Sequence, residues 1–168
     1  MTQEKIKKKF FLNNLNIAVN LMGVNDCNLQ LLEEYFNVTL NAFSNYIDIK
    51  GTSKNVELVY IVLTNLENLI SKGIQFKKND IYNISKMAEN GSIFNLYKLY
   101  KEPLIKNFHN NDVYVKTYGQ LKYINSIKNN DITFGIGPAG TGKTYLSVIM
   151  AVRALKNKNI DKINSSCC

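Results

Sequence analysis

A glycine-rich segment near the end of the sequence constrains the fold more than any other feature. Its residues, Gly137-Pro138-Ala139-Gly140-Thr141-Gly142-Lys143-Thr144, match the pattern G-x-x-x-x-G-K-[ST] in full. Glycines let the backbone take positive φ and bring its N–H groups close to phosphate oxygens, so a nest of donors can form. In such a loop the lysine faces the β- and γ-phosphates, and the threonine hydroxyl is a ligand for Mg²⁺. The segment therefore predicts a site for the phosphates of a nucleotide.

The residues on either side of this loop have the composition of a strand and of a helix. Residues 132–136 form a short β-prone run of the kind that ends a buried strand. Residues 144–156 have helix-forming composition, with apolar side chains at helical spacing. A strand, a glycine-rich loop and a helix in this order suit phosphate binding, because the helix N-terminus adds partial positive charge. The alternative is a glycine-rich turn with a surface lysine.

The pattern continues beyond the loop in both directions. The run from residue 132 to residue 146 is followed by Met150-Ala151-Val152 and Ala154-Leu155-Lys156. Together with the upstream segment, these residues closely resemble the PhoH-like (phosphate starvation-inducible) ATPases. The upstream residues that are similar to the family's T-x-G-Q-x-x-Y-[IV] segment are Thr117, Gly119, Gln120, Tyr123 and Ile124.

The resemblance implies an ATP-binding protein with ATP and Mg²⁺ as ligands and with ATP hydrolysis as the family's activity. Gln120 is similar to the glutamine of the helicase Q-motif, whose amide reads both edges of adenine; the alternative is a solvated helix residue. Thr144 would be the Mg²⁺ ligand. The nucleotide-binding residues that the resemblance implies are Gly137, Pro138, Ala139, Gly140, Thr141, Gly142, Lys143, Thr144, Tyr145 and Gln120.

The first part of the chain has the pattern of a compact α+β module. Residues 10–21 suit either an alternating strand or a helical stripe, and the family resemblance favours a strand near residues 10–12 followed by a short helix. A second helix is expected over residues 27–36 with Asp26 as its N-cap. A longer helix begins at Ser53, carries apolar residues on one face and stops at Gly73. A further helix, capped by Asp80, runs through Ala88 and ends at Gly91.

Between these helices the sequence predicts a β-hairpin over residues 39–43 and 46–50. Ile47 and Ile49 are expected to face inward, and Asp48 and Lys50 outward. The module resembles the KH-like N-terminal domain of PhoH-like proteins, which implies RNA as a partner. However, it has no G-x-x-G clamp, and Phe43-Ser44 stands where the family usually carries Arg-Gly. Phe43 either stacks on a base or is an ordinary core or rim aromatic.

The expected organisation is α/β in three parts. Residues 1–92 form the KH-like module, residues 93–116 a packed linker, and residues 117–168 the N-terminal portion of a P-loop NTPase (RecA/helicase-like) domain. The linker interleaves Lys and Tyr, which suits either single-strand binding by stacking or a solvated inter-domain cover. It also holds the one histidine, His109, which we expect at the surface.

Composition sets further limits. The net charge of +8 favours polyanions, nucleic acid first, although Lys, Asn and Ile all have A/T-rich codons and genome bias contributes. The three cysteines, Cys27, Cys167 and Cys168, do not have the spacing of a disulfide framework or a zinc site. No run of about 18 apolar residues suggests a membrane span, so we expect a soluble, cytoplasmic protein without a membrane partner.

The residues after the loop bear on catalysis. A P-loop ATPase needs a second strand ending in Asp or Glu to hold Mg²⁺, and the sole carboxylate side chain beyond Lys143 is Asp161. We therefore expect a truncated form, natural or frameshifted, with an impaired ATPase and no assignable catalytic residue. Without further strands to cover them, Leu146, Ile149, Met150 and Leu155 would be partly exposed, which would favour aggregation or a homo-oligomer. The alternative is a non-catalytic RNA-associated binding module with a vestigial nucleotide loop, and a small kinase is a weaker third reading.

Overall fold

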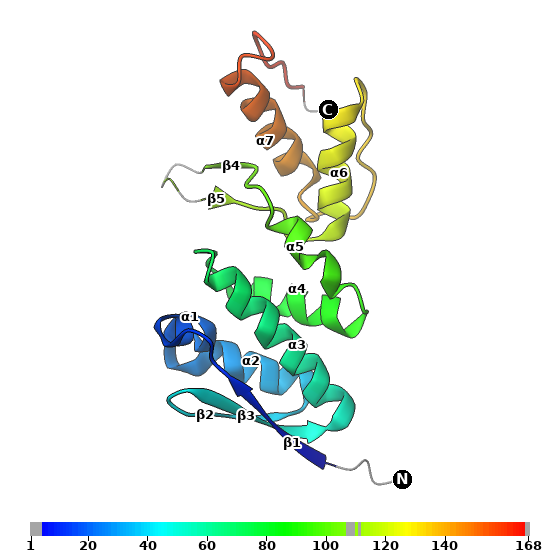
Figure 1. Cartoon of the computed structure of the whole chain (residues 1–168). Helices are drawn as coiled ribbons and strands as arrows, with labels where there is room; N and C mark the ends of the chain where they lie inside the picture. Colours follow the sequence, from blue (N-terminus) through cyan, green and yellow to red (C-terminus); the bar gives the residue numbers. More distant parts are fainter. Residues whose placement is uncertain (1–4, 107–109, 111, 167–168) are drawn as a thin grey trace. The chain divides into compact units, whose positions relative to one another are not determined.

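The computed structural model describes residues 5–106, 110 and 112–166, and the chain divides into two compact units. The first unit is Met1–Tyr97 and the second is Lys98–Cys168. Both mix helices with small sheets (Figure 1), in agreement with the predicted α/β class. No helix among the described residues is long and apolar enough to cross a membrane.

The first unit is a three-stranded antiparallel sheet with helices on one side of it (Figure 1). The sheet order is β1-β3-β2, so the hairpin strand β3 is central and the N-terminal strand β1 is an edge. Its short 3₁₀ helices are Leu15–Ile17, Val24–Asp26 and Ile93–Asn95. The larger elements are β1 (Lys5–Phe11), α1 (Ala18–Met22), α2 (Cys27–Phe36), β2 (Thr39–Ala42), β3 (Tyr46–Thr52), α3 (Ser53–Ile70) and α4 (Lys78–Glu89).

Helix α3 supplies much of the core of this unit. Its apolar residues recur at helical spacing, and Val56, Val59, Leu63 and Leu66 are fully buried, as the sequence predicts. The Thr52 hydroxyl accepts a hydrogen bond from the N–H of Asn55 and caps the helix. After the helix ends, Gly73 has a φ of 81°, which confirms the predicted glycine stop.

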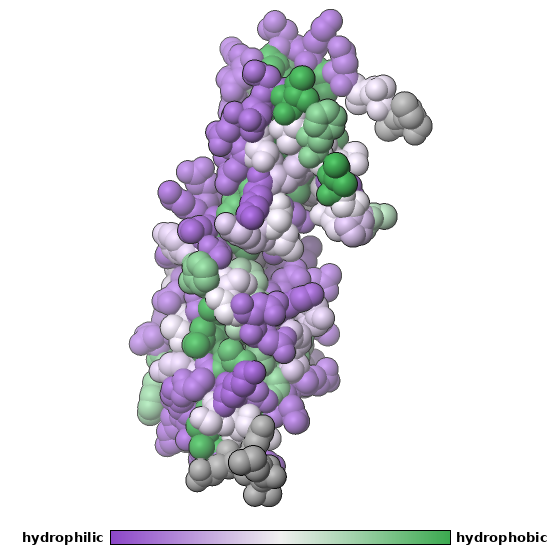
Figure 2. Space-filling model, turned by 90° about the vertical axis from the view of Figure 1, so that its right-hand side faces the viewer, coloured by the Kyte–Doolittle hydropathy of each residue, from purple (hydrophilic) through white to green (hydrophobic). Residues whose placement is uncertain are grey.

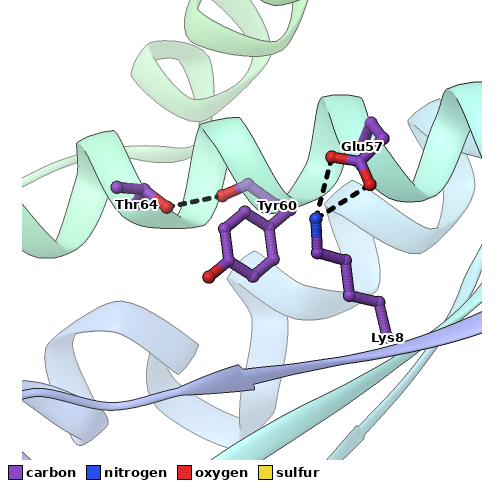
Figure 3. A network of polar contacts seen from close by, with 4 residues as sticks. All are labelled: Lys8, Glu57, Tyr60 and Thr64. Atoms are coloured by element: carbon purple, nitrogen blue, oxygen red, sulfur yellow. Dashed lines mark hydrogen bonds and ion pairs between the residues drawn. The ribbon is translucent and has the colours of Figure 1, made fainter.

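Side-chain contacts hold the edge strand β1 against α3. Lys8 Nζ lies 2.8 Å from Glu57 Oε1 and 4.0 Å from the centre of the Tyr60 ring, and Figure 3 shows this lysine reaching from the strand to the helix. Phe10 packs edge-on against Tyr60, with 5.5 Å between the ring centroids. Further along α3, the buried carboxylate of Glu67 accepts hydrogen bonds from both the backbone N–H and the side-chain amide of Asn13.

The hairpin forms as predicted, but Asp48 is buried, although its outward position predicts an exposed side chain. Ile47 and Ile49 are fully buried on the helix side, and Lys50 is exposed. Asp48 points to the opposite side of the sheet but is buried, because Lys7 of the neighbouring strand forms an ion pair with it at 2.8 Å. The hydrogen bond to Asp48 raises the pKa of Lys7.

Three predicted boundaries need correction. Strand β1 begins at Lys5, well before residue 10, because its lysines pair in register with β3 as far as Thr52. Asp26 stands at the N-cap of α2 with a left-handed φ of 57°, and its side chain makes no capping bond. Helix α4 is capped at Lys77, and Asp80 acts from inside the first turn by accepting the Lys77 N–H at 3.0 Å.

The second unit contains two larger helices that pack against each other, α6 (Tyr118–Asn129) and α7 (Lys143–Lys156). Ile124, Leu146, Ile149 and Met150 are buried there. The expected exposure of Leu146, Ile149 and Met150 is therefore wrong, because α6 packs against α7, whereas Leu155 is 40% exposed as expected. A two-stranded antiparallel pair, β4 (Ile105–Lys106) and β5 (Asp112–Val113), precedes them, and α5 (Leu96–Leu99) lies at the division between the units.

The strand predicted over residues 132–136 does not form. These residues run without a hydrogen-bonded strand partner in the part of the chain that the structure describes. Their apolar side chains face solvent, with Phe134 84% and Ile136 95% exposed. Hydrophobic residues accordingly reach the surface in the upper part of Figure 2. A parallel strand is stable only between neighbouring strands and covering layers, and no such neighbour stands beside this segment among the described residues.

The remaining sequence expectations concern the cysteines, a metal site and the histidine. Cys27 is a free thiol, and the described residues hold no cluster of His, Cys, Asp and Glu that could bind a metal ion. His109, Cys167 and Cys168 lie outside the described residues.

Candidate nucleotide-binding site

The glycine-rich loop connects the extended segment 133–136 to the first residue of α7. Gly142 is the N-cap of that helix and has a φ of 87°, while Gly140 has a φ of 75°. Both values lie in the left-handed region that favours glycine. A Cβ on Gly142 would also come within 3.4 Å of the Gln120 side chain. The loop can therefore lead into the helix with no side chains on these glycines to cover its backbone N–H groups, as phosphate binding requires.

The Lys143 ammonium is held by the loop to which it belongs. Its Nζ donates hydrogen bonds to the carbonyl oxygens of Gly137 at 2.9 Å and Pro138 at 2.6 Å, and lies 3.4 Å from Thr141 Oγ1. The Thr141 hydroxyl in turn donates to the Pro138 carbonyl at 3.1 Å. These contacts place the positive charge at the start of α7, where the helix dipole also favours an anion.

Gln120 of α6 contacts the loop directly. Its amide oxygen accepts the N–H of Lys116 at 2.7 Å, and its amide nitrogen donates to the Thr141 carbonyl at 3.2 Å. The helix is positioned for this by Thr117, whose hydroxyl caps α6 by accepting the N–H of Gln120. Gln120 is therefore not a free solvated residue, because it connects the segment before α6 to the glycine-rich loop.

A cavity of about 420 Å³ lies between α6, segment 133–138 and the start of α7. Lys143 and Gln120 both line it, together with apolar and aromatic side chains. Sequence reasoning missed one contact at its wall: Gly135 packs so closely on Tyr123 that a Cβ would lie 3.0 Å from the ring. The signal was present, since Tyr123 belongs to the upstream motif and Gly135 interrupts an apolar run. Further lining residues are Thr117, Ser126, Phe134, Ile136, Thr141 and Leu146.

The remaining predicted residues lie around the mouth of the loop. Pro138, Ala139 and Gly140 are exposed in the turn, and Thr144 and Tyr145 are exposed on the first turn of α7. Thr144 and Tyr145 do not line the cavity. The structure thus brings six of the predicted residues into one cluster, namely Gln120, Gly137, Pro138, Thr141, Gly142 and Lys143. Ala139, Gly140, Thr144 and Tyr145 lie outside this cluster and are exposed.

Comparison with known proteins connects this cluster to a family. A family model described as PhoH-like protein matches residues 112–165, which include the whole loop and Gln120. The PhoH-like protein of Bacillus subtilis is 37% identical over 163 residues, which cover 97% of this chain and 51% of the relative. The chain belongs to the PhoH-like family.

Other PhoH-like proteins are similar over most of the chain. The protein of Synechocystis is 32% identical over 146 residues, covering 87% of this chain and 44% of the relative. The protein of Mycobacterium tuberculosis is 30% identical over 149 residues, covering 88% of this chain and 42% of the relative. The chain spans about half the length of the curated relatives it matches. No solved structure matches it.

Proposed function

We propose that this PhoH-like chain binds ATP together with Mg²⁺ at the loop formed by residues 137–144. The observation that carries the proposal is the position of the Lys143 ammonium, which is held by the loop carbonyls at the N-terminus of α7 and at the wall of the cavity. Family membership supports a nucleotide-binding function of the ATPase type. No other described cluster combines a fixed cation, left-handed glycines and a helix N-terminus.

The proposed binding step exchanges the partners of Lys143. Without nucleotide, its ammonium donates to two neutral carbonyls, those of Gly137 and Pro138. Phosphate oxygens are charged acceptors and form stronger hydrogen bonds with an ammonium than carbonyls do. The lysine would therefore leave the carbonyls for the β- and γ-phosphates, and the N–H groups of the loop would surround the phosphate.

The other residues have narrower proposed roles. Thr144, exposed on the first turn of α7, would supply its hydroxyl to Mg²⁺. Gln120 would hold the loop through the Thr141 carbonyl, and contact with adenine would require its amide to exchange at least one of its two present partners. Tyr145 would lie beside the bound nucleotide. We assign no catalytic base, and hydrolysis of ATP to ADP and phosphate remains the reaction that the family suggests.

The same proposal covers the organisation of the chain. Residues 117–168 would be the N-terminal portion of a P-loop NTPase domain, residues 93–116 a packed linker and residues 1–92 a KH-like module. The competing function is a non-catalytic RNA-associated module whose nucleotide loop is vestigial. The two functions differ in one measurable property, which is Mg²⁺-dependent affinity for ATP.

Calorimetric titration with ATP and Mg²⁺ tests the proposal. Hydrogen bonds to charged groups contribute about 1.5–3 kcal/mol, so Lys143→Ala should weaken ATP binding roughly tenfold or more. Lys156→Ala is the matched control, because it removes a lysine from the opposite end of the same helix and should leave the affinity unchanged. Equal affinity in the parent and Lys143→Ala would contradict the proposal, and absence of binding in the parent would favour the vestigial loop.

A further inference from the structure

The sheet of the first unit has one face that its helices do not cover. Strand residues alternate between the two faces, and the register pairs Lys7 with Lys50 and Phe11 with Tyr46. Ile47 and Ile49 point to the helices, so these pairs point the other way. We call this the outer sheet face, and it carries Lys5, Lys7, Lys9 and Phe11 of β1 with Tyr46 and Lys50 of β3.

Three aromatic rings gather at one end of the outer sheet face. Phe43, just after β2, stacks on Tyr46 with 4.6 Å between centroids and 18° between planes. Phe11 lies on the other side of Tyr46, with 5.8 Å between the ring centroids. The outer two rings are each about half exposed to solvent, with Phe11 59% and Phe43 46% exposed. Single exposed aromatics are common on proteins, but a row of three contiguous rings offers a stacking platform.

The charge beside these rings is positive. Lys9 Nζ lies 4.5 Å above the Tyr46 ring, and Lys5 and Lys50 are exposed further along the same face. Asp48 is the acidic residue of these strands on that face, and it is buried and paired with Lys7 at 2.8 Å. Alternate residues of a strand are roughly 7 Å apart, so the lysines form a line beside the rings rather than a point charge.

We propose that the outer sheet face binds single-stranded nucleic acid. Unpaired bases stack on Phe11 and Phe43, and phosphates lie along Lys5, Lys9 and Lys50. Stacking requires bases that are not enclosed in a duplex, and aromatic platforms flanked by lysine are suited to such strands. A membrane surface is a poorer fit, because interfacial binding typically uses an amphipathic helix with apolar side chains opposite its charges. The face lies entirely within the first unit and does not involve the ATP loop.

Fluorescence anisotropy on the full chain tests the stacking half of the proposal, with a labelled oligouridylate of about 12 nucleotides as the probe. The double variant Phe11→Ala/Phe43→Ala should bind roughly tenfold more weakly or worse, since each stacked base contributes measurably to affinity. Phe94→Ala is the matched control: Phe94 is 73% exposed in the same unit but lies on the 3₁₀ helix Ile93–Asn95. The control should bind like the parent.

A second pair of variants separates stacking from folding and from charge. Phe11→Leu/Phe43→Leu keeps apolar bulk on the sheet but removes the rings, so it should fold like the parent and still lose affinity. Lys5→Gln/Lys9→Gln should lower the slope of log affinity against log salt by roughly 1.4, because each phosphate contact on a single strand contributes about 0.7. Lys78→Gln/Lys86→Gln removes the same charge from α4 and should leave the slope unchanged.

Four results would overturn the proposal. The first is that the parent does not bind the oligouridylate at low salt. The second is that the parent and the folded leucine variant bind it equally. The third is that duplex RNA competes for the site as strongly as single strands do. The fourth is binding to phosphatidylserine vesicles that the same substitutions abolish while oligouridylate binding is unaffected, which would assign the face to membranes.

Discussion

The two units of this chain differ in how completely they bury their apolar side chains. In the first unit, α3 places Val56, Val59, Leu63 and Leu66 fully inside, between the sheet and the other helices. In the second unit, α6 and α7 bury a smaller set, while Phe134 and Ile136 beside the glycine-rich loop remain in solvent. The first unit therefore owes its shape to a core, whereas the loop of the second is shaped by short-range hydrogen bonds.

This difference shows what each kind of sequence signal can specify. Hydrophobic burial scales with the apolar area removed from water, so the first unit gains stability from contacts across the whole sheet. The loop depends on left-handed glycines, a helix N-cap and a few polar contacts that involve Lys143, Thr141 and Gln120. Such a loop can form although the extended segment that leads into it has no strand partner among the described residues.

The largest expected contrast is in amide hydrogen exchange. Amides of α3 between Val59 and Leu66 should exchange only on global unfolding, and those of residues 133–136 should exchange freely because they lack strand partners. For a domain of ordinary stability the two rates differ by roughly 10³-fold or more. Equal protection would break the comparison, since it would mean that the segment pairs with another strand, for example in a second copy of the chain.

Substitution of one apolar residue in each unit should change the free energy of unfolding by very different amounts. Leu66→Ala removes a fully buried side chain from α3 and should lower the free energy of unfolding by about 2–5 kcal/mol. Val148→Ala removes an exposed side chain from α7, and its effect should stay within about 0.5 kcal/mol. Urea unfolding followed by circular dichroism measures both, and similar losses would show that α7 has a hidden apolar partner.

The smallest expected effect concerns the polar contact that supports the loop. Gln120→Ala removes the hydrogen bonds to the Thr141 carbonyl and from the Lys116 N–H, of which only the first reaches the loop. A neutral hydrogen bond contributes about 0.5–1.5 kcal/mol. ATP affinity should therefore fall roughly two- to tenfold, and Gln120→Glu should lose more because a carboxylate would face that carbonyl. Gln30→Ala, which loses a comparable bond to Asn25 in the first unit, is the control. An unchanged ATP affinity in Gln120→Ala would show that Gln120 does not support nucleotide binding by the loop.

The elements that the sequence predicts well are those with local signals. Helix α3 follows from apolar spacing and a glycine stop, and the β2–β3 hairpin follows from alternating residues on either side of a short turn. The loop and α7 follow from a motif in which nearly every position has a chemical reason. In each case the information lies within about 20 residues, so no knowledge of distant partners is needed.

The elements that it predicts poorly depend on distant partners. The start of β1 does not show the alternation of apolar and polar residues that identifies a strand, because Lys8 stands at a position that faces the helices. The charge of Lys8 is neutralised by Glu57, which is far away in the sequence. Asp48 is buried only because Lys7 of another strand lies beside it. Within the site, the motif identifies Gln120 but not its partners, Lys116 and Thr141, since these contacts exist only in the folded unit. Its proposed role toward ATP stays a prediction.

An NMR titration of the full chain with ATP and Mg²⁺ tests the central claim most directly. If the loop binds the triphosphate, the largest changes in amide shift should fall on residues 137–144 and the first turn of α7, and α3 should remain unchanged. The same titration of Lys143→Ala should show these changes only at much higher ATP concentration. Shifts concentrated in the first unit, or none anywhere at saturating ATP, would contradict the account.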